Sequence, residues 1–331
     1  MTDLTLVYRA SAPSRNSIER LFGALQPHWV CEFKVHRLEV PAAGTSLSDI
    51  FKNIAFVRKH AKGVVHVTGD INYIAGFMRR RPTVLTIHDC GNWMNLRGLK
   101  RHLFRWLWYG VPAKRAACLT AVSQSTKDVL TAKLGISSDR VLVIDNCITT
   151  APPTTKRSFD SNRPKILQIG SGPHKNLAGL IQAVQGRNCE LVIVGSPSSE
   201  DRGALLQYRI PHSIETQVND ERIEALYGEV DILFFASFHE GFGLPILEAQ
   251  AAGVPVITSN LYSMPHVAGH GAWIVSPHDS NSIRQAIDAI CCDEATRLER
   301  VANGKSNIAR FHPAKIAGQY KKVYQRLSSC V

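Results

Sequence analysis

Short runs of hydrophobic, often β-branched residues alternate along the chain with longer amphipathic or polar stretches. In the first half these runs are LTLVY, VCEFKVHRL, GVVHVT, TVLTI, CLTAVS and RVLVI. Such runs, each followed by a helical pattern or a loop, are typical of α/β domains with a parallel sheet. The first half is therefore predicted to be a parallel sheet wrapped by helices.

The same alternation starts again after a segment that has no apolar period. Residues 147–165 (CITTAPPTTKRSFDSNRPK) are rich in proline, threonine and serine, which is typical of a linker. Beyond it, KILQI, CELVIVG, SIETQV, VDILFFAS and VPVITS alternate with helical patterns, and a last helix is expected from Pro313 to about Leu327. The 331 residues also suit two domains. The predicted parts are an N-terminal domain (1–150), a linker (151–163), a C-terminal domain (164–311) and a final helix (312–331) that packs back toward the N-terminal domain.

The positive charge of the chain is concentrated in its first half. Residues 1–150 hold 21 Lys+Arg and 10 Asp+Glu (+11), whereas residues 151–331 hold 18 and 17 (+1). This asymmetry favours an anionic partner, with a basic solvated surface as the alternative. The first residues lack the basic start and apolar run of a signal peptide, so secretion is not expected, and no apolar run approaches the roughly 18 residues that span a bilayer. The eight scattered cysteines are interpreted as reduced cytosolic thiols.

Two glutamates flank a glycine-rich turn in the segment HEGFGLPILEAQAAGVPVI (239–257). Pro245 suits the first turn of a helix and Gly253 suits its C-terminal cap, so Glu240 is placed in a loop and Glu248 about one turn into the helix. Glycine-turn amides at a helix N-terminus suit a phosphate, and carboxylates accept hydrogen bonds from vicinal hydroxyls. A nucleotide sugar has this layout. The alternatives are a solvated loop acid and a helix-capping acid.

A second glycine turn, GSGPHKN (170–176), follows a predicted strand. Gly170 and Gly172 match the start of a dinucleotide-binding pattern, but Lys175 stands at the third glycine. The acid that would bind a ribose is also missing after CELVIVG, so an NAD-dependent dehydrogenase is kept only as an alternative. Lys175 is better explained as a countercharge for a leaving diphosphate, with a solvated lysine as the simpler interpretation.

The glutamate segment resembles the motif of Glu, seven residues and Glu in retaining glycosyltransferases of family four. ILQIGSGPHKNLAGLIQAV resembles the opening of their donor domain, and CLTAVSQSTKDVL resembles a late segment of their acceptor domain. The resemblance implies the α/β GT-B fold, in which two facing Rossmann-like domains have a cleft between them. It assigns the acceptor to the first domain and the nucleotide sugar to the second.

The resemblance also implies roles for individual residues. Glu240 and His88 would contact the transferred hexose, Lys175 the diphosphate and Glu248 the ribose. Many relatives carry an arginine a few residues before the lysine, where this chain has Ser171 and Gly172, so phosphate neutralisation depends more on Lys175. A glycine pair common in the first loop of relatives is also missing. The predicted catalytic residues are Glu240, Lys175 and His88, and the predicted substrate-binding residues are Gly241, Phe242, Gly243, Leu244, Glu248, Ser171 and Gly172.

The segment NLRGLKRHLFRWLWYG (95–110) has leucines at helical spacing and arginines on another face. This pattern suits a helix on an anionic membrane surface, whereas an ordinary helix would pack the same leucines on the sheet. No nucleic-acid-binding module is recognisable, so nucleic acid is not expected as a partner. The residues proposed to face the membrane are Arg97, Lys100, Arg101, Arg105, Trp106 and Trp108.

These observations predict a retaining hexosyltransferase that moves a hexose from a nucleoside-diphosphate sugar to a hydroxyl of a lipid-linked or polysaccharide acceptor of the cell envelope. It is expected to act in the cytoplasm, peripheral on the inner face of the membrane. No cofactor is expected and no metal, because no DxD motif follows a strand, and His266, His270 and His278 lie in a loop. A nucleotide-sugar epimerase of the same architecture and a noncatalytic membrane-surface protein would also fit parts of this pattern.

Overall fold

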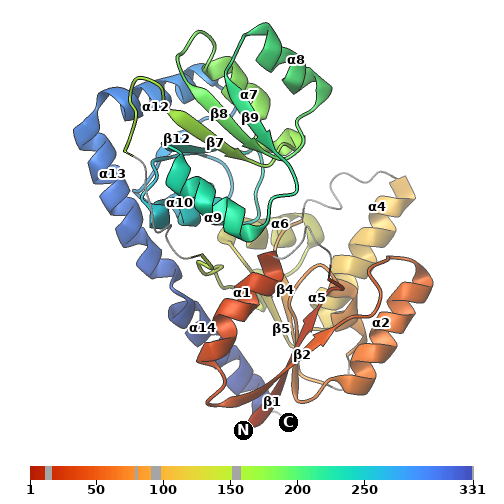
Figure 1. Cartoon of the computed structure of the whole chain (residues 1–331). Coiled ribbons are helices and arrows are strands. Elements are labelled where there is room, and N and C mark those ends of the chain that lie inside the picture. Colours follow the sequence, from red (N-terminus) through yellow and green to blue (C-terminus); the bar gives the residue numbers. More distant parts are fainter. Residues whose placement is uncertain (12–16, 79–80, 91–97, 151–157, 330–331) are drawn as a thin grey trace. The chain divides into compact units, whose positions relative to one another are not determined.

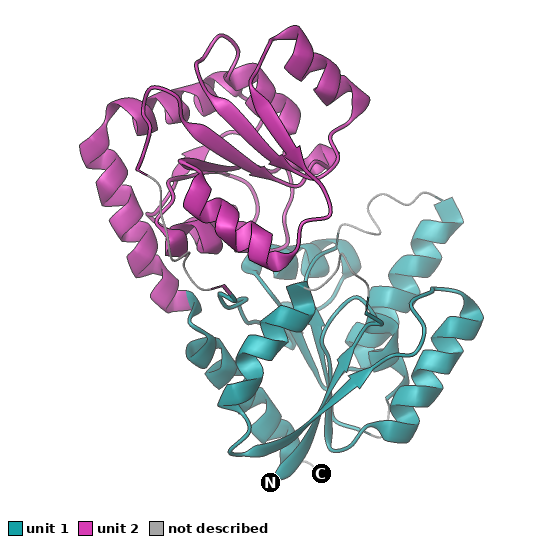
Figure 2. Ribbon diagram, viewed as in Figure 1, with its two compact units in different colours: residues 1–149, 311–331 teal, residues 150–310 magenta. Residues whose placement is uncertain are grey.

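The computed structural model describes residues 1–11, 17–78, 81–90, 98–150 and 158–329. The chain divides into two compact units, which have different colours in Figure 2. Unit 1 comprises Met1–Thr149 together with Phe311–Val331, and unit 2 comprises Thr150–Arg310. Each unit contains a six-stranded, wholly parallel sheet with helices packed on it (Figure 1). The α/β architecture predicted for each half of the chain is confirmed.

The sheet of unit 1 has the strand order β2-β1-β3-β4-β5-β6. Neighbouring residues of a strand point to opposite faces, so Leu4 and Leu6 join one buried core whereas Val7 joins the other. Apolar residues on both faces explain the continuous hydrophobic runs in the sequence. The strands are β1 (Thr2–Tyr8), β2 (Phe33–Glu39), β3 (Val64–Val67), β4 (Thr83–Ile87), β5 (Cys118–Ala121) and β6 (Val141–Val143).

Seven helical segments of unit 1 used below precede residue 150 in the sequence. Ser46 and Ser123 cap two of them, because each side chain accepts a hydrogen bond from a backbone N–H of the first turn. The segments are α1 (Ser17–Leu25), α2 (Leu47–His60), η2 (Asn72–Phe77), α4 (Gly98–Arg105), the π-helical η3 (Trp106–Gly110), α5 (Val111–Arg115) and α6 (Gln124–Leu134).

The last helix, α14 (Pro313–Ser328), packs on the sheet of unit 1 although it follows unit 2 in the sequence. His66 in β3 lies 2.7 Å from the Tyr324 hydroxyl through Nδ1 and 2.7 Å from Thr86 Oγ1 through Nε2. Burial lowers the pKa of His66 to about 3, so the imidazole is neutral at physiological pH. This buried network fixes α14 on unit 1 by hydrogen bonds as well as by apolar packing.

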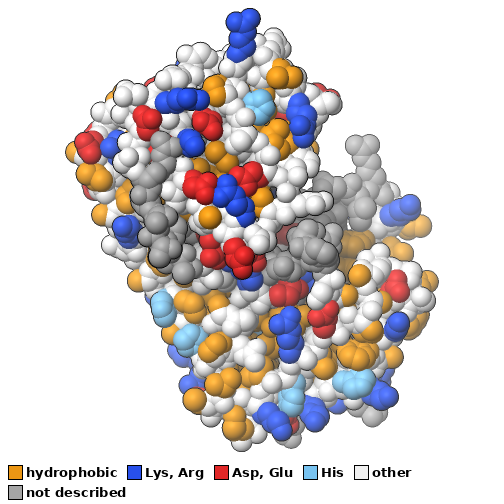
Figure 3. All heavy atoms as spheres, in the orientation of Figure 1, with side chains coloured by type: hydrophobic (Ala, Val, Ile, Leu, Met, Phe, Trp, Pro, Cys, Tyr) orange, Lys and Arg blue, Asp and Glu red, His pale blue; other side chains and the backbone are white. Residues whose placement is uncertain are grey.

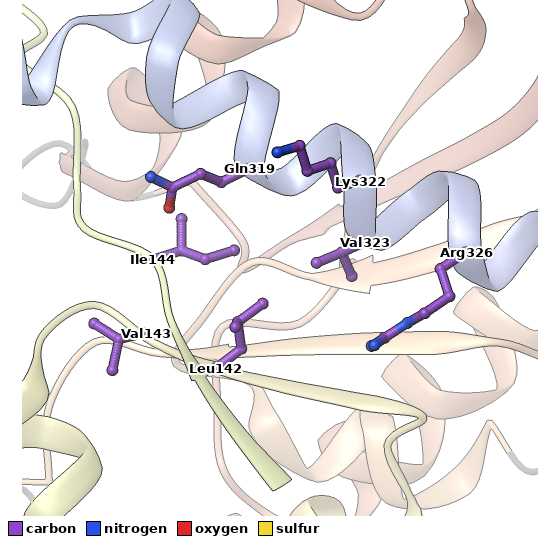
Figure 4. Close-up of a pocket in the computed structure, with 7 residues that line it drawn as sticks. All are labelled: Leu142, Val143, Ile144, Gln319, Lys322, Val323 and Arg326. Carbon is purple, nitrogen blue, oxygen red and sulfur yellow. The ribbon is translucent and has the colours of Figure 1, made fainter. Parts of the chain in front are cut away.

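A pocket of about 390 Å³ lies in unit 1 between the edge strand β6 and α14. Figure 4 shows its apolar side chains coming from both elements, with two basic side chains on the helix. None of these residues is a predicted site residue. The lining residues are Leu142, Val143, Ile144, Gln319, Lys322, Val323 and Arg326.

The sheet of unit 2 has the strand order β12-β11-β10-β7-β8-β9. The strand β12, in the segment GAWIVS, was not predicted, because only three residues of it form a ladder. The other five predicted strands are confirmed. The strands are β7 (Lys165–Ile169), β8 (Glu190–Val194), β9 (His212–Glu215), β10 (Ile232–Phe235), β11 (Val256–Ser259) and β12 (Trp273–Val275).

Four helices of unit 2 have a side-chain cap at the N-terminus. Ser198, Asn219, Asp279 and Asp293 each accept a hydrogen bond from a backbone N–H of the helix that follows. The NGKS sequence at 303–306 lies inside α13 and forms no phosphate loop. The helices are α7 (Leu177–Ala183), α8 (Ser199–Gln207), α9 (Asp220–Glu229), α10 (Leu244–Ala252), α11 (Met264–Ala268), α12 (Ser280–Cys292) and α13 (Glu294–Asn307). Among the described residues, no helix combines the length and apolar character needed to cross a bilayer.

Candidate active site

Two loops of unit 2 leave neighbouring strands at the same edge of the sheet. Strands β7 and β10 pair in parallel, with Phe234 beside Gln168. Their carboxyl ends therefore lie side by side, and parallel sheets present their ligands at this edge. The loop after β7 carries the turn 170–176, and the loop after β10 carries the turn 236–243. Sheet order thus brings the two predicted turns together.

Lys175 and Glu240 form an ion pair across these loops. Nζ of Lys175 lies 2.7 Å from Oε1 of Glu240, and the two side chains are only 19% and 14% exposed. The same ammonium lies 4.7 Å from the centre of the Phe235 ring. Partial burial strengthens the attraction between the charges relative to a pair in bulk water. The side chain predicted to bind a diphosphate and the one predicted to bind a sugar are therefore in direct contact.

Two buried amides, which the sequence analysis did not single out, hold the lysine loop in place. The Gln168 amide nitrogen donates to Gly170 O and Lys175 O, both at 3.0 Å. The Asn176 amide nitrogen donates to Ala236 O (3.1 Å) and to Pro277 O (2.8 Å). The only sequence signal for Gln168 is one polar residue in the apolar strand KILQI. These bonds fix the backbone on both sides of Lys175 and tie it to the exit of β10.

The glycine at position 170 is required by its backbone conformation, and it also lies close to the Lys175 side chain. Gly170 has φ of +86°, and a Cβ there would lie 3.0 Å from Cε of Lys175. Ser171 lies against the end of β8, since a Cβ at Gly195 would be 2.7 Å from Ser171 Oγ. Gly172 precedes the short helix η5 (Pro173–Lys175) that contains the lysine. Ser171 and Gly172 thus connect the end of β7 to the short helix that carries Lys175.

The turn Gly241–Gly243 leads directly into α10. Gly243 has φ of +111°, which only glycine adopts without strain, and Leu244 begins the helix with Pro245 in its first turn. The Phe242 ring is buried, and its carbonyl accepts a 2.8 Å hydrogen bond from Ser263 Oγ. The Phe242 side chain therefore anchors the turn, and only its backbone remains a candidate ligand contact.

Glu248 is oriented by a tyrosine from a different helix. The hydroxyl of Tyr227, which is buried in α9, donates to Glu248 Oε2 at 2.8 Å. A carboxylate held on one side by a buried donor has a restricted orientation, which suits recognition of two adjacent hydroxyls of a ligand. Tyr227 was not identified from the sequence, because nothing in its local pattern distinguishes it from a core aromatic residue.

His88 belongs to unit 1 and follows the carboxyl end of β4. Its Nε2 lies 2.7 Å from Thr68 O, and since a carbonyl only accepts, the neutral ring carries its hydrogen on Nε2. Burial lowers the pKa of His88, although the Thr68 carbonyl and the nearby Asp70 and Asp89 act in the opposite direction. His88 therefore offers Nδ1 as a hydrogen-bond acceptor near neutral pH.

Asp70 beside His88 has a structural partner. Asp70 forms an ion pair with Arg9, whose guanidinium also lies 3.2 Å from the Glu19 carboxylate. The Asp70 backbone has φ of +60°. Its carbonyl accepts a 2.8 Å hydrogen bond from Trp108 Nε1. These contacts hold the loop after β3 at the same sheet edge as His88.

One residue proposed to face a membrane is placed differently by the structure. Trp108 is only 8% exposed and stacks on Phe104, with ring centres 4.6 Å apart, so its assignment to the membrane-facing set is wrong. Tertiary packing of the π-helical segment η3 turns this indole into the core of unit 1.

The part of the basic segment that forms the first turns of α4 lies at the surface. Leu99 and Leu103 are 84% and 60% exposed, so these two leucines do not pack on the sheet. Trp106 is also largely exposed, whereas Arg97 lies outside the described residues. Figure 3 shows basic and hydrophobic side chains together where α4 lies in Figure 1.

Two of the three histidines considered as metal ligands contact other side chains, and the third, His270, is exposed. The His278 ring stacks on Phe238 with centres 4.8 Å apart, and His266 lies 3.4 Å from the Arg310 guanidinium. In the part of the chain that the structure describes, no group of three or more His, Cys, Asp or Glu side chains is arranged to hold a metal ion.

Two protein families match the chain, one in each half. The family described as Glycosyltransferase Family 4 matches residues 5–151, and Glycosyl transferases group 1 matches residues 154–307. These two matches, together with two units that each contain a parallel six-stranded sheet, define a glycosyltransferase of the GT-B fold. The chain belongs to the family-four glycosyltransferases, which confirms the resemblance and the predicted fold class.

Known relatives and solved structures agree with this class. O-antigen chain mannosyltransferase B of Escherichia coli is 30% identical over 217 residues, covering 60% of this chain and 55% of the relative. Sucrose-phosphate synthase from Thermosynechococcus elongatus superposes with a TM-score of 0.81 at 18% identity, covering 100% of both chains. Anabaena HepE in complex with UDP-glucose gives 0.79 at 15% identity, covering 98% of this chain and 100% of that one. The chain spans about a quarter to just over half of the length of the E. coli mannosyltransferases that it matches.

Proposed function

We propose that this protein is a retaining hexosyltransferase that uses a nucleoside-diphosphate sugar and builds a lipid-linked or polysaccharide component of the cell envelope. The observation that carries the proposal is the partly buried Lys175–Glu240 pair beside the glycine turn that opens α10. Mannosyltransferases of O-antigen chains among the relatives, and a structural neighbour that holds UDP-glucose, support this substrate class. Unit 2 takes the donor and unit 1 the acceptor.

The proposed reaction exchanges one bond at the anomeric carbon. The bond from C1 of the hexose to the diphosphate oxygen breaks, and a bond from C1 to the acceptor oxygen forms on the same face of the sugar. The hydroxyl proton of the acceptor passes to the leaving diphosphate, so no dedicated base is required. Charge develops on the diphosphate, and Lys175 with the turn amides stabilises it. Under this proposal the reaction needs neither a metal ion nor a cofactor.

Before the donor binds, Glu240 is the counterion of Lys175. When a diphosphate arrives, the lysine gains a second anionic partner, and the carboxylate can accept hydrogen bonds from hexose hydroxyls. Each of these partly buried charges would be unfavourable without a partner. The ion pair compensates both of them before the donor binds. His88, neutral and with Nδ1 as an acceptor, suits a further hexose hydroxyl.

A thermal-shift screen with UDP, GDP and their hexose derivatives tests the proposal. A ligand that binds only the native state raises the apparent melting temperature, by mass action, so one nucleoside diphosphate series should raise it in a concentration-dependent way. Product analysis with and without a saccharide acceptor then separates transfer from epimerisation, because only an epimerase changes the sugar without an acceptor. No shift with any compound would contradict the proposal.

We further propose that α4 holds the enzyme on the cytoplasmic face of a membrane. Exposed Leu99 and Leu103 of α4, with Trp106 directly after it, alternate with Lys100, Arg101 and Arg105, and apolar insertion beside cations suits anionic headgroups. These basic side chains are part of the +11 excess of residues 1–150.

Replacing both Leu99 and Leu103 by glutamate should weaken binding to phosphatidylglycerol-containing vesicles by about tenfold or more, since each substitution removes an inserted apolar group and adds repulsion. Co-sedimentation at low and high salt measures the effect. Leu206→Glu, at a similarly exposed leucine in α8 of unit 2, is the matched control. Equal binding of the double variant and the wild type would refute the membrane role of α4.

A further inference from the structure

A tyrosine beside the glycine turn has an unusual backbone. Tyr262 lies between β11 and α11 with φ of +54°, in the left-handed region that non-glycine residues seldom occupy. Its side chain is 45% exposed, so burial of the ring does not compensate for this conformation. Residues held in sparsely populated backbone conformations are concentrated at active sites and ligand-binding loops.

The Tyr262 loop is anchored to the turn that carries Glu240. Ser263, which is buried, donates through Oγ to Phe242 O at 2.8 Å and lies 3.5 Å from Glu240 O. These bonds connect the loop to the part of the site assigned to the transferred sugar. Glu248, which the resemblance assigns to the ribose, accepts its hydrogen bond from Tyr227 instead.

The ring of Tyr262 pairs with His239, the residue directly before Glu240. Their centres are 4.9 Å apart and their planes meet at 72°, an edge-to-face arrangement. An edge-to-face pair leaves most of the ring faces uncovered, and both side chains remain at least partly exposed. An aromatic face is electron-rich, so it attracts the polarised C–H bonds on the apolar side of a pyranose. The phenol hydroxyl adds a donor and an acceptor at the rim.

We propose that Tyr262, supported by His239, is a pyranose-binding platform of this enzyme. The inference rests on the proposed function, because it places a sugar at the Glu240 side of the site. A pyranose could reach the platform as the transferred hexose of the donor or as the terminal sugar of the acceptor. Both present the same ring chemistry, and kinetics distinguish them.

Three variants test the platform. Tyr262→Asn removes the ring but tolerates the left-handed backbone, Tyr262→Phe keeps the ring, and Tyr208→Asn changes an exposed tyrosine at the C-terminal end of α8. We expect Tyr262→Asn to leave the melting temperature unchanged or raised while the KM of one sugar substrate increases about tenfold. The other two variants should remain within about twofold of the wild type, because neither loses the Tyr262 ring.

The substrate whose KM rises identifies the source of the sugar. An increase in the KM for the nucleotide sugar, together with a changed rate of donor hydrolysis in the absence of acceptor, assigns the platform to the transferred hexose. An increase for the acceptor alone assigns it to the acceptor. Both KM values within twofold of the wild type would overturn the proposal.

If no nucleotide sugar supports transfer, the proposed function has failed, and a direct titration decides the platform. Saturation-transfer NMR with methyl α-mannopyranoside and methyl α-glucopyranoside should detect contact with the wild type and with Tyr262→Phe. Loss of that signal in Tyr262→Asn supports the platform, whereas equal signals from wild type and Tyr262→Asn reject it.

Discussion

Replacing Lys175 by alanine is expected to lower kcat by about 10²–10³, with a smaller effect on the affinity for the donor. The ammonium group stabilises a diphosphate most when negative charge develops on it, in the transition state, so its loss acts chiefly on turnover. Steady-state kinetics with saturating nucleotide sugar measure the effect. Transfer within about threefold of the wild type would exclude this role for Lys175.

The stability of the Lys175 variant requires its own control, since alanine removes the cation that pairs with Glu240 in a partly buried position. An uncompensated carboxylate there destabilises the fold. The double substitution Lys175→Met with Glu240→Gln removes both charges at nearly constant volume. It should recover the melting temperature that the single variant loses but remain inactive. Recovery of activity together with stability would show that Lys175 acts only as a structural counterion.

Replacing Glu248 by glutamine should weaken nucleoside-diphosphate binding by about 10- to 100-fold, because a hydrogen bond to a charged group contributes about 1.5–3 kcal/mol. Isothermal titration with the nucleotide identified by the thermal screen gives the dissociation constant. The side chain of glutamine has the same shape, so the position of α10 and the fold are preserved.

A deoxynucleotide identifies the partner of Glu248. If the carboxylate binds the ribose hydroxyls, the affinity loss caused by Glu248→Gln should be smaller for the 2′-deoxy compound than for the ribonucleotide, a coupling that a double-mutant cycle measures. Tyr227→Phe removes the donor that orients Glu248 and should weaken binding of the ribonucleotide by a few-fold. Unchanged affinity in Glu248→Gln would mean that the ribose lies elsewhere.

The secondary structure and the two-part organisation of the chain followed from local patterns. Runs such as KILQI and VDILFFAS are β-branched or apolar over most of their length, which a strand buried on both faces requires. Gly253 ends α10 with φ of +69°, as its position after a helical run predicted. The three-residue strand β12 was missed, since so short a run has no periodicity to detect.

Exposure of individual aromatic residues could not be read from spacing. Trp106 and Trp108 have similar neighbours in the sequence, but the first lies at the surface whereas the second stacks on Phe104 and donates to Asp70 O. Residues two apart lie roughly opposite one another on a helix, so only one of the two tryptophans can face the core, and tertiary packing decides which one. Membrane binding, as proposed, therefore depends on α4 and Trp106 alone.

The sequence by itself determined the fold class, the resemblance to family four and the position of two glutamates on either side of a helix-opening glycine turn. These are local features, fixed by hydrophobic period, turn chemistry and motif spacing. Only the tertiary structure decided that Lys175 contacts Glu240, that Gln168 and Asn176 hold the lysine loop, and that Tyr227 orients Glu248. Most of these contacts join residues far apart in the chain, because β10 pairs with β7 and α9 lies beside α10. The order of strands and helices in space arises from packing of the whole domain, which no short segment encodes.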